Sequence, residues 1–375
     1  MIFIIAFISI SYTVLVFTFI LGFNKLKTST YKNSPAKNTF SIIVAFRNEA
    51  ENLETLLTSF SKLNYPINLF EIILINDHSD DEFELIIKKF QVQFPQLNIS
   101  LIHSLKNFTS PKKDAISLGI KHSKLNWIVT TDADCEVPVN WLQSFNQIIE
   151  KKQPYFISAP VKFKPKSSFL FHFQNLNFIS LIGSTIGAFG IKKPFMCNGA
   201  NLCYSKNIFN KLNGFLGNEN IASGDDIFLL EKMIEKHPEK IVFLKNEEAI
   251  IVTNSETSWK KFINQQIRWA SKAGHYKNNF AKLVGALVFL ENLLLVLVTI
   301  FAFIYPFYWL VLCIVFIQKM LLDFILINKT SQFLKINNSR SYFPITSILY
   351  PFFTVFIAFL SFFTNYNWKG RTYKK

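Results

Sequence analysis

Long apolar stretches occur near both ends of the chain. Residues 2–23 form an unbroken apolar run without a charged residue. Three further apolar runs follow Lys282, at 283–304, 307–326 and 342–363. Each of the four is long enough for one helix to cross about 30 Å of hydrocarbon. We therefore expect a transmembrane helix in residues 1–23 and a membrane region in residues 281–366.

The first apolar run is predicted to be an uncleaved anchor. A signal peptide carries positive charge ahead of a shorter apolar core, whereas here Lys25 and Lys27 follow the core. Positive charges tend to stay in the cytoplasm, so we expect the chain to be cytoplasmic from a polar linker at 24–39 onward. This predicts an integral protein of the cell's inner membrane with a cytoplasmic domain.

The last apolar run leaves two topologies open. Three crossings would place the basic tail, residues 367–375, outside the cell, which conflicts with its charge. Pro344 and Pro351 allow residues 342–363 to be re-entrant instead, which would return the tail to the cytoplasm. We favour three crossings. Residues 169–189 are also apolar, but they contain several polar side chains and are predicted to lie on the membrane or line an acceptor path.

Between the membrane segments, short apolar runs alternate with amphipathic ones. The pattern predicts helices that begin near residue 48 and at 81–90 and 111–123, and strands at 40–46, 71–75, 99–103 and 127–131. This alternation is typical of an α/β fold with a mostly parallel sheet and helices on both faces. We expect one such domain in residues 40–280. In these sheets, ligands bind beyond the carboxyl ends of the strands.

Composition narrows the choice of partner. The chain has 375 residues, of which half are hydrophobic and 42 are Phe, which suits one sizeable domain plus membrane segments. The net charge of +15 comes from scattered lysines, many of them beside apolar runs, so anionic lipid explains it better than nucleic acid. The four cysteines show no zinc or redox spacing, and we expect them to be reduced and structural.

Acidic side chains directly follow the predicted strands. Glu49, Asp77, Asp132 and Asp134 all occupy such positions. Any one of them could be a turn or cap residue, but together they would repel one another unless a cation lay between them. Hard divalent ions such as Mg or Mn prefer carboxylate oxygens together with substrate phosphates.

Five segments in order resemble the motifs of family 2 glycosyltransferases with the GT-A fold: 41–49, 75–80, 131–134, 224–229 and 265–269. The resemblance extends from about residue 40 to residue 276. It implies a membrane-bound, inverting, hexosyltransferase-like enzyme that passes a sugar from a nucleotide-diphosphate sugar to an acceptor hydroxyl. A UDP-sugar is the default donor, because it is the commonest in the family.

The resemblance assigns the donor side residue by residue. Glu49 would contact the nucleoside and Asp77 the base. Lys112 would reach the nucleotide, although Pro111 stands where the family usually has glycine. Asp132 and Asp134 match the D-x-D pair, in which the first contacts the nucleotide sugar and the second holds Mg or Mn on the diphosphate.

The acceptor side is assigned in the same way. Asp226 would be the general base, and Asp225 would orient the acceptor or share its proton. The alternative is that this pair only caps the helix predicted at 226–236. Segments 198–201 and 213–215 resemble acceptor-side loops.

The segment at 265–269 resembles the Q-x-x-R-W element. In relatives this element closes over the acceptor and the diphosphate, so Gln265, Arg268 and Trp269 are expected to bind substrate. An amphipathic helix that rests at the bilayer interface is the alternative, and the two roles are compatible.

We expect the chain to transfer one sugar to a lipid or lipid-linked glycan in cell-envelope glycan biosynthesis. The alternative, a processive polysaccharide synthase, usually has more membrane spans. A scaffold would not need carboxylates at strand ends. A transporter would need polar groups within its spans, and these hold only Glu291, Lys319 and Asp323 as charged residues.

Overall fold

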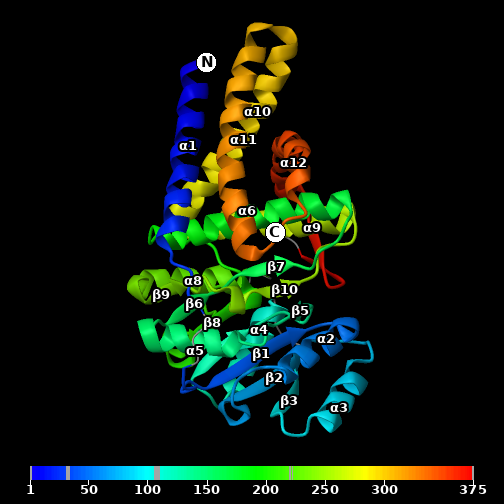
Figure 1. The fold of residues 1–375 in the computed structure, drawn as a ribbon. Helices are drawn as coiled ribbons and strands as arrows, with labels where there is room; N and C mark the ends of the chain where they lie inside the picture. Colours follow the sequence, from blue (N-terminus) through cyan, green and yellow to red (C-terminus); the bar gives the residue numbers. More distant parts are fainter. Residues whose placement is uncertain (1, 31–33, 105–109, 219–220, 222, 374–375) are drawn as a thin grey trace. The chain divides into compact units, whose positions relative to one another are not determined.

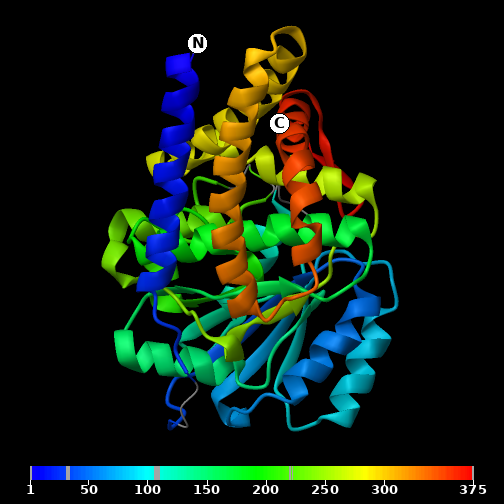
Figure 2. The ribbon, with the colours of Figure 1, turned by 45° about the horizontal axis from the view of Figure 1, so that its top comes forward.

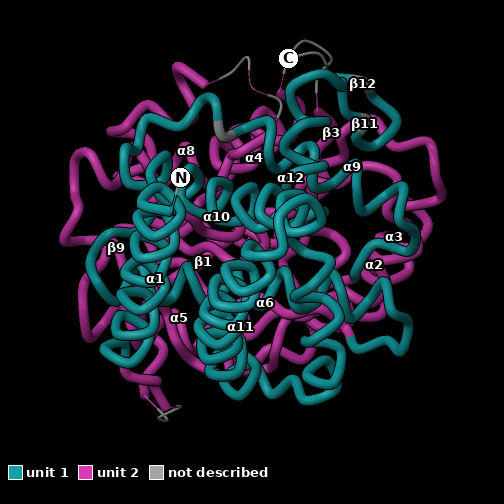
Figure 3. Tube along the Cα trace, turned by 90° about the horizontal axis from the view of Figure 1, so that it is seen from above, with its two compact units in different colours: residues 1–26, 165–195, 255–375 teal, residues 27–164, 196–254 magenta. Residues whose placement is uncertain are grey.

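The chain divides into two compact units (Figure 3). The computed structural model describes residues 2–30, 34–104, 110–218, 221 and 223–373. We call residues 1–26, 165–195 and 255–375 the helical unit, and residues 27–164 and 196–254 the sheet unit. The range expected for the catalytic domain, 40–280, is thus shared between them. Residue 1, residues 31–33 of the predicted linker and residues 374–375 of the predicted tail lie outside the described residues.

A seven-stranded sheet forms the core of the sheet unit (Figure 1). Its strand order is β3-β2-β1-β4-β8-β6-β9, and β3, β2, β1 and β4 run parallel. β8 is antiparallel to both of its neighbours. The strands are β1 (Phe40–Phe46), β2 (Phe70–Asn76), β3 (Ile99–His103), β4 (Trp127–Thr130), β6 (Phe156–Ser158), β8 (Leu202–Ser205) and β9 (Ile241–Phe243). Every residue of β2 is buried, as expected for a continuous apolar run inside a parallel sheet.

Helices and a second sheet complete the sheet unit. The helices are α2 (Ala50–Ser61), α3 (Phe83–Gln93), α4 (Pro111–His122), α5 (Trp141–Lys152), α7 (Lys206–Lys211) and α8 (Asp225–Lys236). The second sheet contains β5 (Cys135–Glu136), β10 (Ile251–Thr253) and β7 (Val161–Phe163). Short 3-10 helices occupy Ile67–Leu69, Gly199–Asn201, Pro238–Lys240 and Glu247–Ala249. The predicted α/β fold with a mostly parallel sheet is confirmed.

The helical unit contains the apolar segments. Its helices are α1 (Ile2–Lys25), α6 (Phe169–Gly190), α9 (Trp259–Ala270), α10 (Asn279–Ile304), α11 (Phe307–Leu334) and α12 (Phe343–Phe363). A hairpin of β11 (Tyr366–Trp368) and β12 (Arg371–Tyr373) follows α12, and 3-10 helices occupy Ala273–His275 and Arg340–Tyr342. Four segments of the described chain are long and apolar enough to cross a membrane: 2–25, 279–304, 307–334 and 340–363. The four predicted segments are therefore confirmed as helices that are long and apolar enough to span a membrane.

α6 crosses α1 at close range, and glycines make the approach possible. In Figures 1 and 2, α6 runs across the long helices of the helical unit. A Cβ atom on Gly187 or Gly190 would overlap the backbone of α1 near Phe19 and Gly22. Small residues commonly allow such crossings between membrane helices. This contact accounts for the inclusion of residues 165–195 in the helical unit.

Three charged residues of the membrane helices, Glu291, Lys319 and Asp323, have partners within the helical unit. Ser9 Oγ donates a hydrogen bond to Glu291 at 3.2 Å, and the Tyr12 hydroxyl donates one to Asp323. Lys319 forms an ion pair with Asp323 one helical turn along α11. Pairing of this kind lowers the cost of charge in an apolar surrounding. It joins α1 to α10 and α11.

α11 differs from its predicted range at its end. It continues beyond residue 326 to Leu334. The added turns are more polar, but they bury Thr330, Ser331 and Phe333 inside the helical unit. Packing against neighbouring helices therefore extends the helix past the apolar run that marked it in the sequence.

Candidate active site

The loops after β1 and β2 lie together at the carboxyl edge of the sheet. The register pairs Phe46 with Asn76, so Glu49 and Asp77 follow neighbouring strand ends. The Asp77 amide donates a hydrogen bond to the Phe46 carbonyl at 2.8 Å, and Arg47 Nη1 donates one to the Asp77 carbonyl at 3.3 Å. Both acidic residues are buried. The structure brings these two predicted positions together.

Two residues with positive φ shape these loops. Asn48 has φ of 52° and His78 has φ of 57°. The Asn48 amide donates to Ser79 Oγ at 3.0 Å, and Asn48 Oδ1 accepts from the Asp80 amide at 3.0 Å. Side-chain hydrogen bonds of this kind stabilise left-handed turns at Asn. These hydrogen bonds hold the loop after β1 and the loop after β2 together.

Lys112 lies among carboxylates from two distant parts of the sequence. Its Nζ is 2.6 Å from Asp132 Oδ1 and 3.7 Å from Asp225 Oδ2. Burial alone would lower the pKa of Lys112, but the charges of Asp132 and Asp225 outweigh it and raise the pKa above the usual lysine value. The side chain is therefore a permanent cation that links the D-x-D segment to a second acidic cluster, which consists of Asp225 and Asp226.

Pro111 takes the first position of α4. Proline is well suited to this position. An N–H group in the first turn has no acceptor within the helix, so its absence costs nothing, and the φ angle of proline is already helical. The substitution of proline for the usual glycine is thus compatible with a helix that begins directly before Lys112.

Asp226 is half-buried in the first turn of α8. Its Oδ2 accepts a hydrogen bond from the Gly199 amide at 3.1 Å, and its Oδ1 accepts one from the Ile227 amide at 2.8 Å. Gly224, at φ of 86°, precedes the helix in a conformation that favours glycine. The two amides fix the orientation of the carboxylate. The bond to Gly199 lies outside α8, so Asp226 does more than cap its own helix.

Gly199 also approaches Asp225 closely. A Cβ atom at this position would lie 3.2 Å from Asp225 Oδ2. Any side chain at residue 199 would therefore crowd the second acidic cluster, which explains glycine in this expected acceptor-side loop.

Asp134 is held by a residue that the sequence did not single out. Thr253 Oγ1 donates a hydrogen bond to Asp134 Oδ2 at 3.1 Å. Thr253 is at the end of β10, which pairs with β5 directly after Asp134. Within the described residues, no three His, Cys, Asp or Glu side chains form a metal cluster of their own. Single carboxylates suit an ion such as Mg²⁺, which is commonly completed by substrate phosphates.

The cysteines beside these residues are buried. Cys135 and Cys203 are both inaccessible, and burial raises the pKa of each thiol well above its usual value. A thiol in such a site stays protonated and is a poor nucleophile. They have the reduced, structural character that the sequence predicts.

The remaining expected substrate-binding residues belong to α9 of the helical unit. Gln265, Arg268 and Trp269 are spaced so that they share one helix face. Gln265 Nε2 donates a hydrogen bond to Glu256 Oε1 at 3.1 Å. The guanidinium carbon of Arg268 lies 5.1 Å from the ring centre of Trp368. Trp269 is partly exposed.

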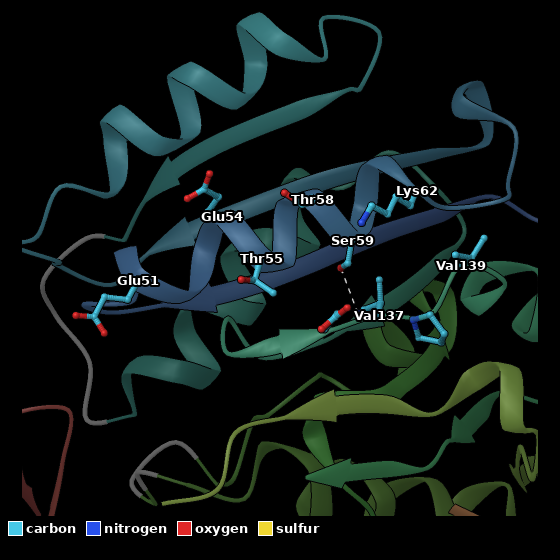
Figure 4. A pocket seen from close by; sticks show the side chains of 10 residues that line it. Glu51, Glu54, Thr55, Thr58, Ser59, Lys62, Val137 and Val139 are labelled. Atoms are coloured by element: carbon cyan, nitrogen blue, oxygen red, sulfur yellow. Dashed lines mark hydrogen bonds between the residues drawn. The ribbon is translucent and has the colours of Figure 1, made fainter. Parts of the chain in front are cut away.

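A cavity of about 500 Å³ opens beside α2 (Figure 4). Glu51, Glu54 and Thr58 line it from α2, opposite residues 136–139. Ser59 Oγ accepts a hydrogen bond from the Val137 amide at 3.2 Å across its floor. The lining includes none of the residues that the sequence assigns to substrate.

Two family models match the chain. The model for glycosyl transferase family 2 matches residues 41–212, and the model for glycosyl transferase family group 2 matches residues 127–363. The second match covers more than half of the chain and includes α9 and α12.

Individual relatives are distant. The glycosyltransferase AglE of Haloferax volcanii is 24% identical over 103 residues, which are 28% of this chain and 33% of AglE, so only a third of that relative is spanned. A mannosyltransferase from Pyrobaculum calidifontis, whose structure contains GDP-Man and Mn²⁺, has a TM-score of 0.57 at 14% identity over 96% of this chain and 99% of that one. S. aureus TarS has a TM-score of 0.43 at 16% identity, over 63% of this chain and 39% of TarS. The extent of the family group match and the shared fold identify the chain as a member of glycosyl transferase family group 2, a GT-A glycosyltransferase with helices able to span a membrane.

Proposed function

We propose that the chain moves one sugar from a nucleotide-diphosphate sugar to a lipid or lipid-linked glycan, with inversion at the sugar carbon. The observation that carries this proposal is the ion-pair network around Lys112. Asp132 and Asp225 come from the two acidic motifs, and both contact the same ammonium. Donor-side and acceptor-side residues are therefore neighbours.

Glu49, Asp77 and Lys112 form the donor side. The two buried carboxylates suit hydrogen bonds to a nucleoside, because they accept without competition from bulk water. Lys112 supplies a cation for the diphosphate. The Pyrobaculum mannosyltransferase with GDP-Man supports a nucleotide-sugar donor, and UDP-sugars are the default among donors.

Asp134 is the residue that would hold Mg or Mn. Its carboxylate is oriented by Thr253, as expected for a metal ligand with a supporting hydrogen bond. A divalent ion bound here would neutralise the charge that develops on the leaving diphosphate. The Mn²⁺ in the Pyrobaculum mannosyltransferase supports the same cofactor class.

Asp226 is the general base of the proposed reaction. It removes the proton from the acceptor hydroxyl while the hydroxyl oxygen attacks the anomeric carbon. The bond between that carbon and the diphosphate oxygen breaks, and its electron pair leaves with the nucleoside diphosphate. The amides of Gly199 and Ile227 hold the carboxylate in place. Asp225 orients the acceptor.

The acceptor is membrane-associated in this proposal, because four segments are able to span a bilayer. α9 contributes Gln265, Arg268 and Trp269 to the acceptor and the diphosphate. Arginine offers a planar fork for phosphate oxygens, and tryptophan offers an apolar face for a sugar ring. The catalytic residues act from the cytoplasm, where nucleotide sugars are available.

A donor screen tests the function. The full chain is purified into nanodiscs and incubated with labelled UDP-sugars and GDP-sugars, Mn²⁺ and a total lipid extract. The proposal expects one donor to be consumed and one labelled sugar to appear on lipid-extractable material. Absence of donor binding in calorimetry across the panel would contradict it. A long polymer as product would replace it with a processive synthase.

A further inference from the structure

The hairpin at the end of the chain packs on the helix that carries Gln265 and Arg268. Ile267 on α9 forms a buried cluster with Ile357 of α12 and Tyr366 of the hairpin. Trp368 and Tyr373 pack against the same cluster. All of these residues belong to the helical unit. Residues 366–373 are thus an integral part of the surroundings of α9.

Trp368 presents its ring face to Arg268. The guanidinium carbon is 5.1 Å from the ring centre, within the range of a cation–π contact. The indole is itself held by other rings, because the Tyr373 ring lies 6.3 Å from it and stacks on Tyr366 at 5.5 Å. A guanidinium that lies over an aromatic ring face can still donate hydrogen bonds from its N–H groups to oxygens.

We propose that Trp368 is a positioning residue for sugar transfer, which fixes the plane of the Arg268 guanidinium so that its N–H groups meet the diphosphate. This inference rests on the proposed function, in which Arg268 binds the diphosphate. An unstacked arginine must lose several rotatable bonds on binding phosphate. Trp368 removes part of that cost before the donor arrives.

The contact also bears on the topology of α12. Phe353 in the middle of α12 stacks on Phe262 of α9 at 5.2 Å, and the hairpin after α12 reaches Arg268. Only residues 254–258 separate α9 from β10, and roughly five residues cannot cross a bilayer. The hairpin therefore lies on the side of the membrane where the chain enters α9. We infer that residues 343–363 re-enter that side, which would keep residues 366–373 beside α9.

The positioning role is tested by a double-mutant cycle on turnover. Trp368→Ala should lower kcat/KM by about 3- to 30-fold, the range of a cation–π contact, while Trp368→Phe should cost less than about threefold. In an Arg268→Ala background, Trp368→Ala should change the rate by less than about twofold, because its effect passes through the guanidinium. Trp309→Ala, which removes an exposed tryptophan of α11, is the matched control and should leave the rate unchanged.

The alternatives give different results in this cycle. If Trp368→Ala slows the reaction equally in both backgrounds, the hairpin acts only through folding and the inference is wrong. If Arg268→Ala retains wild-type turnover, the proposed role of α9 in substrate binding is wrong, whatever the effect of Trp368→Ala. If Trp368→Ala has a normal rate while Arg268→Ala has lost turnover, the inference about Trp368 is wrong and the proposed function stands. If Trp368→Ala does not accumulate in membranes, Trp368→Leu retains apolar contact without a ring face and replaces it.

Cysteine labelling tests the side of the tail. In a Cys313→Ser background, Asn365→Cys precedes the hairpin at an exposed position. The inference expects a membrane-impermeant maleimide to label it only after spheroplasts are opened. Labelling in intact spheroplasts would show that α12 crosses and that Trp368 does not meet Arg268.

Discussion

The acidic residues of the sheet unit and the motif residues of α9 are held by different kinds of interaction. In the sheet unit, backbone amides fix Asp226, and Lys112 joins Asp132 to Asp225. In the helical unit, Arg268 is held by the ring of Trp368, which lies one hundred positions later in the sequence. Backbone contacts survive most side-chain substitutions, whereas the contact between Arg268 and Trp368 is lost when either side chain is replaced.

This difference predicts how the two regions respond to mutation. Substitutions in the acidic network should abolish sugar transfer while the protein still folds, because the strand ends and the backbone amides stay in place. Substitutions around α9 should lower turnover only partly, because they disturb the orientation of Arg268 and remove no reacting group. The predictions below separate the two behaviours.

The largest effect is expected at Asp226. Asp226→Asn keeps the shape of the side chain and one of its two acceptor oxygens but cannot take a proton, so transfer should fall by about two to four orders of magnitude. Donor affinity should change little. Pre-steady-state transfer and donor calorimetry on the same preparation measure both quantities. Parallel loss of donor affinity with persistent turnover would remove Asp226 from the role of base.

Metal dependence is the next largest effect. Asp134→Asn should lower metal-dependent donor binding by about a hundredfold or more, as expected for the loss of several kcal/mol of charge stabilisation. Titration of donor with and without Mn²⁺ measures it. Thr253→Val, which removes only the hydrogen bond to Asp134, should cost less than about tenfold. Full activity of the wild type in excess chelator would exclude this role.

The helical unit is probed by Arg268→Lys. Lysine keeps the charge but loses the planar fork and the stacked geometry, so turnover should fall by about ten- to a hundredfold while insertion is normal. Rates are measured per correctly inserted molecule, with membrane extraction as the check on insertion. Lys261→Arg, an exposed change on the same helix, is the matched control. Near-normal turnover of Arg268→Lys would indicate that α9 is only an interfacial anchor.

The smallest effect concerns acid stability of the helical unit. His172 is buried, bonds to Ser339 Oγ at 3.0 Å and stacks on Tyr342 at 4.0 Å. Burial lowers the pKa of His172, so its neutral form is favoured in the folded state. Its stabilising contribution is complete above the unfolded value of about 6.5 and is lost as pH falls through the lower folded value.

A His172→Gln variant tests this linkage. It should show a smaller drop in Tm between about pH 7.5 and about pH 5.5 than the wild type, by about one to three degrees. His122→Gln, on the exposed face of α4, should retain the full drop. An identical drop in wild type and His172→Gln would assign the acid sensitivity to other groups.

The sequence predicts those parts of the site that follow local pattern. Glu49 and Asp77 could be placed together because each follows a buried strand, and parallel strands end at one edge. The apolar runs predicted the membrane helices for the same reason, since length and hydropathy are local properties.

Contacts between distant segments could not be read in this way. Thr253 meets Asp134, and Trp368 meets Arg268, across about a hundred residues or more. Neither Thr253 nor Trp368 belongs to a motif, and a lone threonine or tryptophan carries no local signal for its partner. The inclusion of residues 165–195 in the helical unit likewise depends on the packing of glycines between α6 and α1.

The central claim is that the two acidic motifs form one site around Lys112. A double-mutant cycle on the affinity for nucleoside diphosphate with Mn²⁺, using Asp132→Asn and Asp225→Asn, tests it most directly. Because both carboxylates contact one ammonium, the account predicts that the effect of the double substitution differs from the product of the single effects by more than about threefold. Effects that multiply within about twofold would show that the two motifs act independently and would contradict it.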